Sequence, residues 1–342
     1  MSIPAEVEGW IDEERYRETA NFPVERGYLW TSLASVENGN PLFWDDKVAA
    51  ELTDGPVAPP TTLSLWFRPH SWEPGQTAPK LPLQVHFDLK DRLDLPEAVM
   101  TDNEVTFATP VRPGDGISMS QVLRSISEPK TTKLGTGRFW VIDVDYRNQH
   151  GDQVGVETFT GFGYKRGEAP VAPVAPAAAK PPSPKAQIED GDLPTLRYEV
   201  TASTVVLGAL ATRDWRPMHH DVDFAVNRNG TKDIFLNTPN QQAWFERFVT
   251  DWTGPEGRLG RLRFRMLDSI YPRDTMVITG RVDEDGTDDV GCRWATVAIQ
   301  VWATDTGDDA DARLCTTATV RVARPTTSDD NPWRRTGDQW QP

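Results

Sequence analysis

The segment Asp214-Trp215-Arg216-Pro217-Met218-His219-His220-Asp221 is the most informative part of the chain for chemistry. It places a carboxylate five residues before one imidazole and six before another. A carboxylate can accept a proton from water while an imidazole orients that water and donates, and both groups can titrate near neutrality in a partly buried site. An isolated aspartate and histidine would equally suit a turn residue and a surface histidine. The surrounding elements therefore decide between the two interpretations.

A long helix is predicted to follow the segment. Thr238 is a good N-cap residue and Pro239 suits the first helical position. Apolar residues then recur at helical spacing: Phe245, Phe248, Val249 and Trp252. A shorter helical stretch precedes the segment, at Val206, Leu207 and Leu210. The candidate chemistry thus lies in a loop between two helices.

Strands with one buried face are predicted after the long helix, because apolar residues there recur with a period of two. The alternating sets are Leu262, Phe264 and Met266; Met276, Ile278 and Val282; Ala295, Val297, Ile299 and Val301; and Ala318, Val320 and Val322. In the first half of the chain, Leu83, Val85, Phe87 and Leu89 alternate in the same way. The helical candidate of that half, after Pro59-Pro60, is shorter and less regular. One long helix wrapped by an antiparallel sheet is the expected arrangement.

The two halves of the chain are related to each other. NGNPLFWDDKVA, from Asn38, matches DWRPMHHDVDFA, from Asp214, with the prolines 41 and 217 offset by 176 residues. VRPGDGISMSQVL, from Val111, matches IYPRDTMVITGRV, from Ile270, with the prolines 113 and 272 offset by 159. The matches occur in the same order, which predicts a duplicated domain.

The composition changes sharply at residues 167–192, GEAPVAPVAPAAAKPPSPKAQIEDGD. This Pro- and Ala-rich composition favours an extended linker and cannot build a packed core. We therefore expect an N-terminal domain at 1–166, a linker at 167–192, a C-terminal domain at 193–324 and a polar, mobile tail at 325–342.

Charge and composition exclude several classes of function. The 342 residues carry a formal net charge of −15, which argues against nucleic acid as a partner. The start of the chain lacks the features of a signal peptide, and no stretch approaches a membrane span, so a cytoplasmic protein with no membrane partner is expected. The two cysteines, Cys292 and Cys315, suggest neither a metal site nor a disulfide framework. The run Arg258, Arg261, Arg263 and Arg265 is either a basic patch for a polyanion or a solvated strand face.

At Asp214–Asp221 the sequence resembles a known family. The segment is similar to the D-x-N-P-x-H-x-D signature of MaoC-like, hydratase-2 enoyl-CoA hydratases. ASVENGNPLFWDD followed by GPVAPPTTL resembles the dehydratase-like partner domain of double-hotdog members. DIFLNTPNQQAWFERFVTDWTGP resembles hydratases of actinobacterial acyl-CoA and steroid side-chain catabolism. The resemblance covers most of residues 25–324 apart from the linker. It implies an α+β double hotdog, each half a long helix wrapped by an antiparallel sheet.

The resemblance also implies which residues do the chemistry. In that family an aspartate and a histidine hold a water as it adds across the 2,3 double bond of a thioester. Here these are Asp214 and His219, since the motif places the imidazole five residues after the aspartate. The family stabilises the thioester oxygen with a backbone amide of a His-Gly pair, and the matching residue is Thr238, in Asn237-Thr238. The chain departs from the motif at Arg216, which replaces an asparagine.

The N-terminal half keeps the frame of the motif without its chemistry. Asn38 stands where Asp214 stands, and Phe43 stands where His219 stands. Glu37 is adjacent but is expected to point elsewhere. This half should therefore shape the pocket, and in double-hotdog relatives a degenerate half makes room for bulky acyl chains.

The expected function is reversible hydration of a 2-enoyl-CoA, (R)-specific, with a bulky acyl group such as a steroid side chain or a branched or long fatty acyl. No cofactor or metal is expected, with coenzyme A entering only as part of the substrate. Three alternatives stay open: a dehydratase acting on acyl carrier protein, a non-catalytic partner subunit of a hydratase, and a thioesterase. The chain is expected to act as a homodimer or in a hetero-oligomer of hotdog domains.

Overall fold

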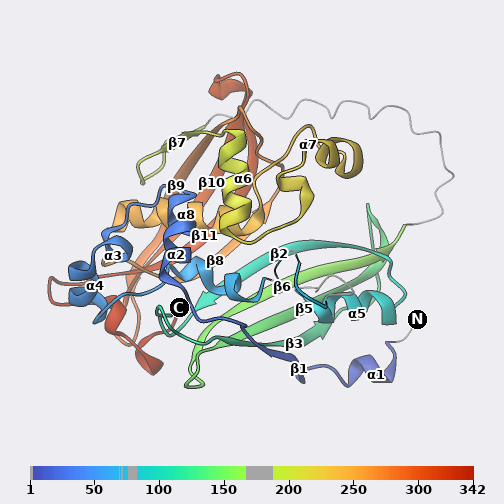
Figure 1. Cartoon of the computed structure of the whole chain (residues 1–342), viewed down its shortest axis with the longest axis horizontal. Helices are drawn as coiled ribbons and strands as arrows, with labels where there is room; N and C mark the ends of the chain where they lie inside the picture. Colours follow the sequence, from blue (N-terminus) through green and yellow to red (C-terminus); the bar gives the residue numbers. More distant parts are fainter. Residues whose placement is uncertain (1–2, 69, 71, 76–82, 167–187) are drawn as a thin grey trace.

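The computed structural model describes residues 3–68, 70, 72–75, 83–166 and 188–342 (Figure 1). These residues form one eleven-stranded sheet in which neighbouring strands run antiparallel. The strand order is β1-β3-β5-β6-β2-β8-β11-β10-β9-β7, with β4 paired to β5 outside this path. The two halves of the chain thus contribute to a single continuous sheet.

The N-terminal half supplies the strands from β1 to β6. Their bounds are β1 (Glu14–Thr19), β2 (Glu97–Phe107), β3 (Ser118–Ile126), β4 (Lys130–Thr132), β5 (Gly135–Arg147) and β6 (Gln153–Lys165). Its helices are α1 (Ala5–Glu8), α2 (Arg26–Ala34), α3 (Pro41–Trp44), α4 (Asp46–Thr53), the 3-10 helix η1 (Pro60–Phe67) and α5 (Gln84–Arg92).

The C-terminal half supplies the remaining strands. Their bounds are β7 (Leu196–Glu199), β8 (Arg258–Met266), β9 (Thr275–Thr287), β10 (Arg293–Thr304) and β11 (Arg313–Arg324). Its main helices are α6 (Ala202–Ala211), the 3-10 helix η2 (Pro217–His219), α7 (Val222–Phe224), the π-helix η3 (Ala225–Asn229) and α8 (Thr238–Thr253). Three short 3-10 helices complete the half: η4 (Asp309–Asp311), η5 (Pro332–Arg334) and η6 (Gly337–Gln339).

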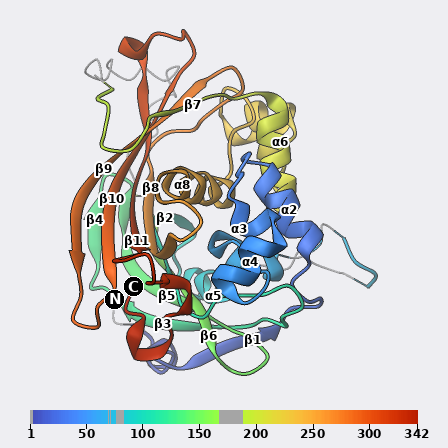
Figure 2. The ribbon, with the colours of Figure 1, turned by 90° about the vertical axis from the view of Figure 1, so that its left-hand side faces the viewer.

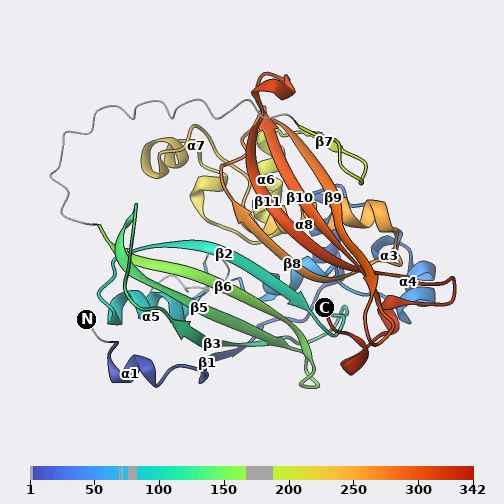
Figure 3. The same cartoon turned by 180° about the vertical axis from the view of Figure 1, so that it is seen from behind.

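The pairing of β2 with β8 joins the two halves at the middle of the sheet (Figure 3). Glu104 lies opposite Arg263, and Val105 lies opposite Leu262. On each side of this pair the strands follow in the same relative order, so the strand order is equivalent when the sheet is followed from either edge. This arrangement is that of a duplicated domain whose copies are related by a local two-fold axis.

Backbone geometry repeats at the landmarks that the sequence predicts. Glu37 and Arg213, 176 residues apart, both adopt a left-handed conformation, with φ of 51° and 52°. The following residues make equivalent bonds, from the Asn38 N–H to Leu33 O and from the Asp214 N–H to Ala209 O, each 2.9 Å long. The expected internal repeat is therefore present in three dimensions.

The second landmark repeats as well. Asp115 Oδ2 accepts from the Arg112 N–H, and Asp274 Oδ2 accepts from the Tyr271 N–H, at 2.7 Å in both halves. These pairs are offset by the predicted 159 residues, so both sequence matches correspond to the same local structures.

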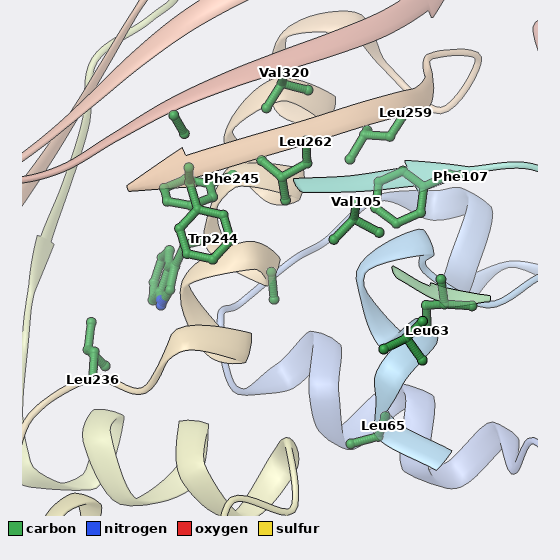
Figure 4. Packing of buried hydrophobic residues seen from close by; sticks show 14 of the residues in the cluster. Leu63, Leu65, Val105, Phe107, Leu236, Trp244, Phe245, Leu259, Leu262 and Val320 are labelled. Atoms are coloured by element: carbon green, nitrogen blue, oxygen red, sulfur yellow. The ribbon is translucent and has the colours of Figure 1, made fainter. Parts of the chain in front are cut away.

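Helix α8 lies against the inner face of the C-terminal part of the sheet, with α2 and α6 on its other side (Figure 2). Its expected apolar positions Phe245, Phe248 and Val249 are buried. The helix begins with Asn237 as the N-cap and Pro239 as the second helical residue, one position earlier than predicted. Apolar side chains of α8 and β8 continue into those of η1 and β2, so one core spans both halves (Figure 4).

The strand predicted at Leu83–Leu89 is wrong, because these residues belong to helix α5. Val85, His86 and Leu89 are its buried residues, spaced as on one face of a helix. Positions i and i+4 suit both a helix and a strand, so a short run cannot distinguish them by periodicity. After Pro59-Pro60 the N-terminal half forms the eight-residue 3-10 helix η1 in place of a long α-helix.

The tail after Arg324 is packed, contrary to the expected mobility. Trp333 and Trp340 are buried. The Trp340 ring lies 3.6 Å from the Arg258 guanidinium carbon, and its Nε1 donates to Phe107 O over 2.7 Å. Arg258 in turn donates to Pro332 O and Arg335 O. The buried arginine and the two indoles thus tie the tail to both halves.

The predicted linker falls largely on residues 167–187, which lie outside the described residues. The domain boundaries therefore stay predictions. Among the described residues, no helix combines the length and the apolar character needed to cross a membrane.

Trp340→Ala should lower the free energy of unfolding by about 3–5 kcal/mol, the usual cost of removing a buried tryptophan. Trp72→Ala, at an indole that is 71% exposed, is the matched control and should change it little. Denaturant unfolding of both variants measures the difference. Equal stabilities would show that the tail does not contribute to the core.

Candidate active site

Asp214 lies in the loop that leaves α6, and its side chain is almost fully buried at 3% exposure. The left-handed Arg213 reverses the chain, and the Asp214 N–H bonds back to Ala209 O, closing the end of the helix. The local fold thus turns a carboxylate inward, where it requires partners.

Three donor groups hold this carboxylate. Arg216 binds it through two hydrogen bonds, from Nε to Oδ1 and from Nη2 to Oδ2, each 2.9 Å long. Asn237 Nδ2 donates to Oδ2 over 3.1 Å. Burial acts to raise the pKa of Asp214, but the hydrogen bonds and charge of Arg216, with the charge of Arg68, outweigh it. The pKa of this carboxyl lies well below its usual range.

His219 faces the same carboxylate. Its Nδ1 donates to Phe235 O over 2.8 Å, which leaves Nε2 directed at Asp214 Oδ2, 3.6 Å away. Because a carbonyl only accepts, this bond assigns the proton of the neutral ring to Nδ1. Burial lowers the pKa of His219, so the neutral imidazole is favoured. Nε2 is then a free acceptor next to a carboxylate.

His220 is separated from this pair. It is exposed, and its Nε2 lies 3.2 Å from Trp215 O. The structure therefore brings His219, and not its neighbour, to Asp214.

Thr238 opens helix α8 beside the carboxylate. The side chain of its N-cap residue, Asn237, makes no capping bond and donates instead to Thr212 Oγ1 and Asp214 Oδ2. The Thr238 N–H precedes the first intrahelical bond, and Pro239 has no N–H. The helix start thus offers the Thr238 amide to a ligand.

A cavity of about 700 Å³ connects these groups to the N-terminal half. Asp214, Thr238 and Pro239 line it from the C-terminal half, whereas His219, at 2% exposure, is not among the lining residues. The N-terminal half contributes polar and charged side chains together with a set of apolar ones: Phe67, Leu83, Phe87, Met100, Met119, Val144 and Phe159. Both halves therefore build one pocket.

The N-terminal copy lacks each chemical group of the C-terminal one. Asn38 Oδ1 accepts from the Asn40 N–H, and Phe43 is buried in a small apolar cluster. The Ala58 N–H bonds to Val111 O as the Leu236 N–H bonds to Ile270 O, which places Pro60 at the position of Thr238. Proline has no amide proton to donate. The loss of this amide donor was not predicted from the sequence, although Pro59-Pro60 could have indicated it.

Glu37 points away from the cavity, as expected. Its carboxylate accepts from the Tyr198 hydroxyl over 3.1 Å and lies 3.9 Å from Arg247. It belongs to the contact between the two halves and supplies no substitute for Asp214.

The arginine run does not form one basic patch. Arg258 is buried, Arg261 donates to Pro342 O, and Arg263 pairs with Asp102. Of this run, only Arg265 lines the cavity. The packed tail holds Arg258 and Arg261, and the ion pair with Asp102 holds Arg263.

Comparisons with known proteins place these observations in a family. The family model described as FAS1-like, dehydratase domain region matches residues 14–156. The chain is 39% identical over 90 residues to the 3-oxo-4,17-pregnadiene-20-carboxyl-CoA hydratase beta subunit of Mycobacterium tuberculosis, covering 69% of that protein and 26% of this chain. It is 24% identical over 182 residues to a probable enoyl-CoA hydratase alpha subunit of Thermomonospora curvata, covering 56% of that protein and 51% of this chain.

Solved structures share the fold. A MaoC-like dehydratase superposes with a TM-score of 0.63 at 16% identity, covering 93% of this chain and 99% of the other. A MaoC-like dehydratase of Phytophthora capsici gives 0.61 at 14%, covering 94% and 99%. A Mycobacterium tuberculosis protein described as having a double hotdog fold gives 0.57 at 12%, covering 91% and 96%. The α+β double hotdog is confirmed, and the chain belongs to the MaoC-like family of hydratases and dehydratases.

Proposed function

We propose that the chain catalyses the reversible hydration of a 2-enoyl-CoA to an (R)-3-hydroxyacyl-CoA at Asp214 and His219. The observation that carries this proposal is the pair itself. Nε2 of a neutral histidine faces a buried carboxylate oxygen at 3.6 Å, beside a free helix N-terminus and a large cavity. No cofactor enters the proposed reaction.

The pair is suited to hold one water molecule. His219 Nε2 and Asp214 Oδ2 are both acceptors, and a water satisfies both by donating one hydrogen to each. While Arg216 binds it, the Asp214 carboxylate is a weak base, so His219 Nε2 is the better proton acceptor. This division of roles is the reverse of the one expected from the sequence, where the carboxylate takes the proton.

In the proposed reaction, one proton moves from the water to His219 and then to C2 of the substrate. The water oxygen bonds to C3 of the enoyl group as Nε2 removes its proton, and negative charge moves to the thioester oxygen. The Thr238 N–H and the dipole of α8 stabilise that charge. The imidazolium, stabilised by Asp214, returns the proton to C2.

The cavity supports a bulky acyl group and a polyanionic carrier. Both halves contribute apolar lining residues, and those of the N-terminal half include Phe67, Phe87 and Phe159. Among the lining residues that the structure describes, Arg68, Arg213, Arg216 and Arg265 bring positive charge into a protein of net charge −15. Coenzyme A, with its phosphates, suits this cavity. An acidic carrier protein needs a basic docking face, which the overall charge disfavours.

One observation supports each of two other possibilities. The tight Arg216 bonds occupy Asp214 and favour a non-catalytic partner subunit. The relatives from Mycobacterium tuberculosis and Thermomonospora curvata are both named as subunits, which favours assembly of this chain with a further hotdog chain. We propose that any such partner adds to a catalytic site that this chain already contains.

Purified protein should hydrate at least one ester from a panel of short, long, branched and sterol-derived 2-enoyl-CoAs. Loss of the conjugated double bond, followed by absorbance, is the measurement. Asp214→Asn should remove nearly all activity, whereas Asn38→Ala, its matched control, should retain most of it. Inactivity towards the whole panel, or equal losses of kcat in the two folded variants, would contradict the proposal.

His219→Ala should lower kcat by about 10²–10⁴, the usual contribution of a positioned acid or base, and His220→Ala by less than about tenfold. Because the neutral imidazole is the active form and its pKa is lowered, wild-type kcat/KM should fall only at pH values below 6.5. Thermal melts must show that both variants fold. An inactive His220→Ala with an active His219→Ala would refute the assignment.

Thr238→Pro should remove the proposed amide donor with little change in fold. Asn237 is already extended, with φ −85° and ψ 159°, and the N-terminal copy carries proline at this position. We expect kcat to fall by about 10²–10³. Thr238→Ala keeps the amide and should retain most activity. An active proline variant would exclude this amide from the reaction.

A further inference from the structure

A buried polar cluster lies on the inner face of the N-terminal sheet, within the same cavity. Asn103 Nδ2 donates to Glu157 Oε1 over 3.0 Å, and the Tyr146 hydroxyl donates to Oε2 over 3.3 Å. Gln242 Nε2, from α8, donates to Asn103 Oδ1 over 3.2 Å. All four side chains line the cavity and are at most 8% exposed. The proposed reaction uses none of them.

The residues opposite Glu157 on the adjacent strands are apolar. Its cross-strand neighbours are Val105 on β2 and Val144 on β5, both buried. A carboxyl group in such a place is costly unless it has partners, and burial raises its pKa. The Gln242–Asn103 amide pair by itself already joins α8 to the sheet. Holding α8 on the sheet therefore does not by itself explain the carboxyl group of Glu157.

One buried hydrogen-bond donor in the same cavity has no partner within the described residues. Arg68, whose charge acts on Glu157 and Tyr146, lines the same cavity. Its Nε is buried and has no hydrogen-bond partner within the described residues. An unfilled buried donor on a residue that lines the same cavity suits an oxygen atom supplied by a ligand.

The cluster lies at a defined distance from the proposed thioester site. Gln242 follows Thr238 by four residues on α8, about 6 Å along the helix axis. An acyl group whose thioester oxygen meets the Thr238 amide therefore passes the cluster about one helical turn or more away.

We infer that this cluster, through Glu157, Tyr146 and Arg68, binds a carbonyl or hydroxyl oxygen carried by the acyl group beyond its reacting double bond. The inference rests on the proposed function for the position of the thioester. It adds the substrate class: an oxygenated acyl chain, selected over its hydrocarbon analogue. Glu157 and Tyr146 determine specificity and take no part in the proton transfers.

Binding of saturated esters tests the inference without turnover. The probes are dodecanoyl-CoA and a series of oxo-dodecanoyl-CoA esters with the carbonyl at successive positions from C5 onward, titrated calorimetrically into the full chain. We expect one or two positions to bind about tenfold more tightly than the unsubstituted ester. Glu157→Leu and Tyr146→Phe should each reduce this preference while leaving the Kd of dodecanoyl-CoA nearly unchanged. Phe159→Leu, on the apolar lining, should weaken all esters alike.

Three results would overturn the inference. In the first, the wild-type protein prefers no oxo position. In the second, the preference survives in both variants. In the third, a variant weakens the binding of oxygenated and plain esters equally. Should Glu157→Leu fail to fold, Tyr146→Phe and the wild-type series still decide. Failure of every ester to bind would overturn the proposed coenzyme A substrate and this inference with it. Preference for an oxo ester without any hydratase activity would refute the proposed reaction alone.

Discussion

The buried carboxylate of Asp214 is the constraint on which the site depends. A charge that is 3% exposed is tolerated only with close partners, and Arg216, Asn237 and His219 supply them. These partners come from η2 and from the residues just before α8. Satisfying one charge thereby fixes the imidazole, the helix start and the loop between them relative to each other. Removing any partner would disturb all three.

Duplication of the domain explains why the proposed reactive groups lie in one half of the chain while the other half lines the same cavity. The β2–β8 pairing places the inner faces of both halves along one continuous sheet. Asn38, Phe43 and Pro60 occupy the positions of the carboxylate, the imidazole and the amide donor. None of these three can perform the proton transfers or donate the backbone hydrogen bond. In the proposed reaction the N-terminal half supplies no reacting group, and side chains from its sheet line the cavity.

The sequence predicted the features that depend on local pattern. The two repeat offsets reappear in backbone hydrogen bonds, and the buried positions of α8 follow the predicted spacing. Features set by distant partners were not predictable. Leu83–Leu89 is helical because its buried residues pack as a helix face, and the tail is ordered because Arg258 and Trp340 meet across the fold. The Nδ1 bond of His219 to Phe235 O, which assigns the tautomer, has no signal in the spacing.

In the proposed reaction, water adds to carbon at the Asp214–His219 pair and does not attack the thioester. Turnover of an active enoyl-CoA in ¹⁸O-labelled water, with the product analysed by mass spectrometry, tests it most directly. We expect an intact thioester with ¹⁸O in the hydroxyl at C3, and no such product from Asp214→Asn. Free coenzyme A together with ¹⁸O in a released carboxylate would contradict it and assign the chain to thioester hydrolysis.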